Sequence, residues 1–138
     1  MKKLLLGLLL VSGLASAQVI SNDLISIRIG SVNLKQVEKT EDGTVVDVNS
    51  YLYFQNAKYQ HISDLKFIWL TSQSKVDKLF EDLNKMLMVP EGTEASLGVF
   101  RTYDFATKSL YIQADGGYTR ITRKQGYKLA EALAGFEL

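Results

Sequence analysis

The chain contains no cysteine and only one histidine and one proline among its 138 residues. Without cysteine, disulfide scaffolds, thiol chemistry and zinc sites built on thiolates are excluded. Zinc sites usually need two or more His or Cys ligands, and a Ser-His-Asp triad needs its histidine beside a nucleophile. We interpret the lone histidine, His61, which follows the expected turn at residues 55–58, as an ordinary strand or loop residue. The sequence also has no glycine-rich phosphate loop and no spaced acidic calcium loop. It therefore predicts no catalytic residue, no metal site and no cofactor.

The first 17 residues have the three zones of a secretory signal peptide. Lys2 and Lys3 provide the positive charge, residues 4–14 are apolar, and a small-residue cleavage site ends at Ala17. The apolar stretch would make a helix of roughly 16 Å, too short for a hydrocarbon core of about 30 Å. We therefore predict cleavage on export, a mature N-terminus at Gln18, and a periplasmic or secreted protein.

The predicted mature chain, residues 18–138, has the size of a single domain. The signal peptide carries two of the 16 positive charges, which leaves 14 basic against 15 acidic residues. This balance gives no reason to expect nucleic acid or an anionic membrane as a partner. No second apolar run approaches the length of a membrane span, so the mature domain is predicted to be soluble.

Alternating apolar residues predict strands in both halves of the mature chain. The first strand is expected to bend or bulge at Gly30 and then to continue, whereas Asp42-Gly43 is typical of a tight hairpin turn. The expected strands cover residues 24–34, 46–54, 59–71, 95–103, 108–113 and 118–121.

Two segments with an apolar stripe predict amphipathic helices. The first begins at Ser74 as N-cap and stops before Pro90. The second begins with a capping box of Thr122 and Gln125 and ends at Gly135. Residues of both helices and of one strand are expected to share a core: Leu52, Phe54, Leu79, Leu83, Leu129 and Leu133.

These elements predict an α+β domain, with one antiparallel sheet of about six strands and both helices on one face. The helices share a short sequence echo, residues 78–83 against residues 128–133. The echo fits a tandem βββα repeat, but two unrelated amphipathic helices would produce it as well, and we favour the second explanation.

Tyrosines are expected on the sheet face that the helices leave uncovered. Strand parity points Tyr51 and Tyr53 outward in the first half, and Tyr111 and Tyr118 outward in the last hairpin, with Arg120 among them. Tyrosine and arginine are enriched at binding hot spots, although tyrosine also suits half-exposed strand positions. The pattern makes these five residues a candidate binding surface.

Basic residues surround the start of the last helix, where the helix dipole disfavours positive charge. A carboxylate or phosphate held by Thr122, Arg123 and Lys124, with help from Arg120, would account for their position. The alternative, which we favour, is that long solvated side chains tolerate the small cost.

The sequence thus predicts a non-catalytic exported binding module whose partner is an exported protein, a glycan or a second copy of the chain. The alternative is a small exported hydrolase with a carboxylate-based or Ser/Lys-based site. An enzyme should have a concave pocket with converging titratable groups, and an interaction module a broad aromatic patch. The carboxylates that lie close in sequence are Glu38, Glu41 and Asp42; Glu81 and Asp82; and Glu91 and Glu94.

Overall fold

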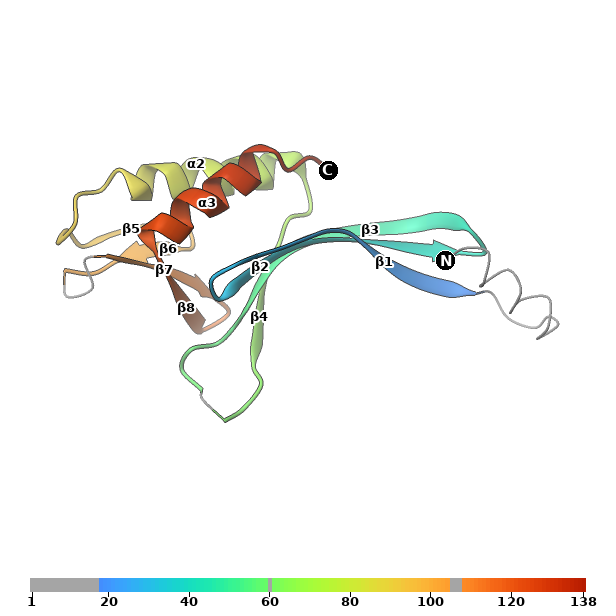
Figure 1. Ribbon diagram of the computed structural model, residues 1–138, viewed down its shortest axis with the longest axis horizontal. Coiled ribbons are helices and arrows are strands. Elements are labelled where there is room, and N and C mark those ends of the chain that lie inside the picture. Colours follow the sequence, from blue (N-terminus) through green and yellow to red (C-terminus); the bar gives the residue numbers. More distant parts are fainter. Residues whose placement is uncertain (1–17, 60, 105–107) are drawn as a thin grey trace.

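The computed structural model describes residues 18–59, 61–104 and 108–138, so the predicted signal peptide lies outside the described residues. Within these ranges the chain forms four antiparallel strands and a helix, and then repeats this order (Figure 1). The α+β class is confirmed. The order is ββββα in each half, one strand more than in the βββα unit considered from the sequence.

Each half has its own four-stranded sheet, in which the strands are neighbours in chain order. Sheet A consists of β1 (Val19–Ile29), β2 (Val32–Glu41), β3 (Thr44–Gln55) and β4 (Leu65–Trp69), and α2 (Gln73–Leu87) follows it. Sheet B consists of β5 (Ala95–Leu97), β6 (Phe100–Thr102), β7 (Ser109–Ala114) and β8 (Gly117–Thr122), and α3 (Arg123–Ala134) follows it.

The expected single sheet of about six strands is therefore corrected to two sheets of four. Gly30 has a φ of 59° and reverses the chain, so the expected strand 24–34 is the hairpin of β1 and β2. Gly98, with a φ of 61°, reverses the chain again between β5 and β6. A positive φ serves a bulge and a tight turn equally well, and this is why the sequence pattern did not separate them.

The helix caps follow from local hydrogen bonds. Ser72, and not Ser74, is the N-cap of α2, because it has extended backbone angles and its side chain accepts from the Lys75 amide. The capping box of Thr122 and Gln125 at the start of α3 is confirmed, as is the stop of that helix at Gly135.

The two helices pack against each other and against one face of each sheet, which we call the inner face (Figure 1). Gly126 of α3 allows their close approach, since a Cβ there would lie 2.8 Å from Leu87 Cδ2. The predicted core is confirmed, with every member at most 6% exposed: Leu52, Phe54, Leu79, Leu83, Leu129 and Leu133.

Sheet A is longer than the helices that cover it. The 12 residues of β3 extend roughly 40 Å, whereas the 15 residues of α2 extend roughly 22 Å. Gln36 marks the end of the covered part, because its side chain donates to the Glu137 carbonyl of the C-terminal segment. Beyond it, residues 19–24 and 37–49 project past the helices (Figure 1). We call this part the arm.

Candidate functional site

The outer face of sheet A, opposite the helices, carries four aromatic side chains. Tyr51 and Tyr53 alternate along β3 with buried leucine and phenylalanine, so they point away from the core. The register of β4 places Trp69 directly beside Tyr51 and Phe67 directly beside Tyr53. Neighbouring rings in the group have centroids 5.2–5.8 Å apart. We call Tyr51, Tyr53, Phe67 and Trp69 cluster A.

The rings of cluster A support one another. Phe67 is stacked on both Tyr53 and Trp69, with interplanar angles of 26° and 11°. Tyr51 meets Phe67 edge-on, at 64°. Such pairs contribute about 0.5–1.5 kcal/mol each beyond their burial, so the four rings hold a fixed arrangement. Trp69 remains 51% exposed, and cluster A is an aromatic surface with little freedom to rearrange.

Sheet B carries a second aromatic group on its outer face. The Tyr103 and Tyr111 rings meet edge-on at 4.8 Å, and the Tyr111 and Tyr118 rings lie 5.9 Å apart. We call Tyr103, Tyr111 and Tyr118 cluster B. Together with Gln113 they line an open depression of about 350 Å³.

Two arginines flank cluster B. The Arg101 guanidinium lies 4.7 Å from the Tyr103 ring centroid and forms an ion pair with Glu94 at 3.0 Å. Arg120 is the cross-strand neighbour of Tyr111 and is exposed. Cluster B therefore combines aromatic rings, phenol hydroxyls, an amide and positive charge around one hollow. It can stack on a ligand and hydrogen-bond to it at the same time.

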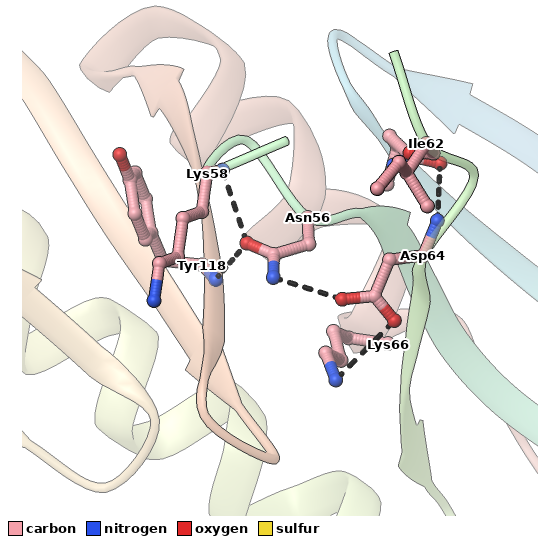
Figure 2. Close-up of polar contacts among 7 residues, drawn as sticks. Asn56, Lys58, Ile62, Asp64, Lys66 and Tyr118 are labelled. Carbon is pink, nitrogen blue, oxygen red and sulfur yellow. Dashed lines mark hydrogen bonds and ion pairs between the residues drawn. The ribbon is translucent and has the colours of Figure 1, made fainter. Parts of the chain in front are cut away.

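Asn56 joins the two sheets and so places the two clusters relative to each other (Figure 2). Its side chain is almost fully buried and has three partners. The Asn56 amide donates to Asp64 Oδ2 at 3.0 Å, and its carbonyl oxygen accepts from the Lys58 amide at 3.1 Å and the Tyr118 amide at 3.2 Å. Since Tyr118 belongs to cluster B, the loop after β3 fixes the strand that carries it.

Main-chain contacts complete this joint. The Ala57 amide donates to the Tyr118 carbonyl at 2.7 Å. At Gly117, a Cβ would lie only 2.8 Å from the Asn56 side chain and from Lys66 Cε, so a larger residue would push the two strands apart. The Asn56 hydrogen bond lowers the pKa of Asp64 below its usual range, and the Lys66 ammonium 3.4 Å away acts in the same direction.

The structure brings the predicted tyrosines together in pairs at two places. Tyr51 and Tyr53 belong to cluster A, Tyr111 and Tyr118 belong to cluster B, and all four are half-buried on the faces away from the helices. Four residues of these clusters were not predicted from the sequence: Phe67, Trp69, Tyr103 and Arg101. Phe67 and Trp69 alternate with the packed residues Ile68 and Leu70, and this parity was the signal that could have found them.

Comparison with protein-family models, with curated proteins and with solved structures finds no match to this chain. We therefore infer the function from the geometry of the two clusters and of the surfaces around them. In the described ranges, no helix is long and apolar enough to cross a membrane.

Most hydrogen-bonding groups at the start of α3 have partners within the protein. The Arg123 amide donates to the Lys108 carbonyl at 3.0 Å, and its guanidinium donates to the Val89 carbonyl at 2.7 Å. Thr122 uses both its amide and its hydroxyl in the capping box. Arg120 and Lys124 are exposed. Anion binding at these residues stays a prediction.

Several carboxylates that a hydrolase could use are engaged with cations. Glu81 pairs with Lys85 at 3.0 Å, and Asp82 pairs with Lys78 at 3.1 Å. The hydrogen bond from Lys85 lowers the pKa of Glu81. Among the described residues, no three His, Cys, Asp or Glu side chains are grouped as a metal ion would require. His61 is exposed in the loop before β4.

Proposed function

We propose that this protein is an exported, non-catalytic binding module whose ligands dock on clusters A and B. The observation that carries the proposal is the gathering of seven aromatic side chains on sheet faces that the helices do not cover. A globular domain usually buries such side chains or scatters them, and a contiguous group of this kind is typical of an interaction site.

The energetics of aromatic side chains favour such a role. An aromatic side chain buries roughly 150–250 Å² when it is fully covered, and it has few torsions to immobilise; the half-buried rings of the two clusters still offer part of that area to a partner. The rings of cluster A are already held by their neighbours, so docking would order them little further. Individual tyrosines and tryptophans at interfaces account for about 2 kcal/mol or more of binding energy.

The two clusters favour different partners. Cluster A presents four contiguous rings, including the half-exposed indole of Trp69, and this largely aromatic surface suits a protein partner. Cluster B has hydroxyls, the Gln113 amide and a hollow, which suit a glycan with its many hydroxyl groups. An exported protein and a glycan are therefore both proposed partners, each at its own sheet.

The single tryptophan of the chain, Trp69, provides the test, because it belongs to cluster A and its fluorescence responds to a ligand that covers the cluster. We would titrate the mature protein with a panel of soluble oligosaccharides and with purified proteins exported by the same cell. A ligand of cluster A should shift the Trp69 emission, and Trp69→Ala should weaken its binding at least about tenfold. A ligand of cluster B should lose affinity in the Tyr111→Ala, Tyr118→Ala double variant.

Tyr127→Ala is the matched control, because Tyr127 is an exposed tyrosine on α3, away from both clusters. It should bind like the unaltered protein. If every ligand found binds the cluster variants and the control equally well, the aromatic faces are not the binding site and the proposal is wrong.

A further inference from the structure

The arm continues the inner face of sheet A beyond the point where the helices and the C-terminal segment cover it. Along β3, Val48 comes two residues before the buried Ser50, which is followed at every second position by the buried Leu52 and Phe54. The Val48 side chain is therefore on the same face as theirs. Val45 lies opposite the buried Thr40 of β2 and is also on this face. The valines of β3 therefore continue the inner face along the arm, while β2 contributes Glu38 opposite Val48.

This extension is exposed. Val45 and Val48 are 52% and 46% exposed, and the bulge residues Val46 of β3 and Leu24 of β1 are 50% and 49% exposed. At the root of the arm, a hollow of about 270 Å³ lies between Val48, Trp69 and Leu138. The inner face of the arm thus offers aliphatic side chains along its length and, at one end, room for an apolar side chain of a partner.

The arm is also acidic. It has five carboxylates and one lysine, Lys39. One of the carboxylates, Asp23, pairs with Lys35 at 3.3 Å. The others form no ion pair with a described residue: Glu38, which lies on the inner face opposite Val48, and Glu41, Asp42 and Asp47 towards the end of the arm. The valines are therefore bordered by net negative charge, because these four carboxylates face a single arm lysine, Lys39, which lies opposite Asp47.

We propose that the inner face of the arm docks a cationic amphipathic segment of another polypeptide. Apolar side chains of that segment cover the valines and enter the hollow at the root, while its lysines or arginines meet the acidic border. A second copy of this chain fits less well, because packing two arms face to face would bring their unpaired carboxylates together. An anionic membrane surface is repelled for the same reason.

The test uses the mature protein and two labelled synthetic peptides with the same pattern of leucines, one with lysine and one with glutamate at the polar positions. Fluorescence anisotropy should show binding of the lysine peptide, weakened about tenfold or more by high salt, and no binding of the glutamate peptide. Equal binding of both peptides would overturn the proposal.

Two variants with equal added charge then locate the contact. Val45→Lys with Val48→Lys places two lysines on the inner face, and Ser21→Lys with Asn49→Lys places two on the outer face. The inner variant should lose at least about tenfold in affinity and the outer variant only about twofold. Equal losses would show that the peptide responds to net charge alone, and the inner face would then not be the docking surface.

A third variant, Glu38→Gln with Glu41→Gln, removes acidic charge without touching the valines. It should weaken binding of the lysine peptide and reduce its salt dependence, and unchanged binding would contradict the proposed acidic border.

Sedimentation of the protein, alone and with anionic vesicles, tests the two other possible occupants of the inner face. If the protein alone forms a dimer that the inner variant abolishes, the occupant of the inner face is a second copy of the chain. If the protein sediments with anionic vesicles and the inner variant does not, the occupant is a membrane surface. Either result would overturn the proposal.

Discussion

The two halves of the molecule have the same order of elements and very different strand lengths. The first three strands of sheet A have 11, 10 and 12 residues, whereas those of sheet B have 3, 3 and 6. The helices that follow are nearly alike, with 15 and 12 residues. A strand rises about 3.3 Å per residue and a helix about 1.5 Å. The strands of sheet B are therefore short enough for the helices to cover, whereas those of sheet A are not.

The same alternation of side chains along β3 leads to burial under the helices and to exposure in the arm. Val48 and Leu52 occupy equivalent positions of one alternating strand, yet Leu52 is fully buried and Val48 is 46% exposed. The difference arises from the length of the covering helices and not from the strand itself. Four predictions test how far the covered body and the arm differ.

The largest expected difference concerns the core. Leu83 is fully buried between the helices and the sheets, so Leu83→Ala should lower the free energy of unfolding by about 2–5 kcal/mol. Val48→Ala on the arm should change it by no more than about 0.5 kcal/mol, because the side chain is already half exposed. Denaturant unfolding measures both. A loss below about 0.5 kcal/mol for Leu83→Ala would show that its assignment to the core is wrong.

The next comparison is between two asparagines near opposite ends of the covered part of sheet A. Asn56→Ala leaves the Lys58 and Tyr118 amides without their acceptor, and each buried unsatisfied group costs about 1–3 kcal/mol. Asn49 makes one exposed hydrogen bond on the arm, and Asn49→Ala should cost less than about 0.5 kcal/mol. Equal losses in the two variants would mean that Asn56 does not join the sheets.

Local features of this fold were predictable from sequence and long-range ones were not. The Asp42-Gly43 hairpin and the capping box of Thr122 depend on residues a few positions apart, and both are present. The packing of the two sheets against each other depends on Asn56 and Tyr118, which are 62 positions apart and carry no shared sequence signal. Parity within each strand was readable because side chains alternate, but which strands become neighbours is decided by such distant contacts.

The same limit applies to the candidate site. The alternation of β3 indicated the face that Tyr51 and Tyr53 occupy, but their contacts with Phe67 and Trp69 require the register of β4. That register follows a loop held by Gln55, whose side chain donates to the Ile62 carbonyl. No pattern in the sequence gives the length of such a loop in advance. Strand parity indicated outward tyrosines, and the structure shows that they belong to two separate clusters, one on each sheet.

A smaller effect should appear in the pH dependence of stability, at Asp64 beside the contact between the two sheets. The pKa of Asp64 in the folded protein is below its ordinary value of 3.8, chiefly because Asn56 donates a hydrogen bond to it. A carboxyl group of this kind stabilises the fold fully above its unfolded pKa, and the contribution is lost as the pH falls through the folded pKa. The melting temperature of Asp64→Asn should therefore lie below that of the unaltered protein at pH 7, and the gap should narrow towards pH 3. A constant gap would exclude this linkage.

The smallest effect is expected at the root of the arm, where Asp23 of the arm forms an ion pair with Lys35 of the covered part. The hydrogen bond with Asp23 raises the pKa of Lys35, but the Asp23 side chain is 51% exposed, and ion pairs of this kind contribute about 0–1 kcal/mol. Asp23→Asn should therefore lower the free energy of unfolding by less than about 1 kcal/mol, and raised salt should remove most of the loss, because screening acts within about 10 Å at 0.1 M. The cost of Leu83→Ala should persist in the same salt, since the core that it weakens is apolar and shielded from ions. If the Asp23 variant were as destabilised as the core variant and insensitive to salt, the arm would belong to the packed body of the protein, and the contrast between the two regions would fail.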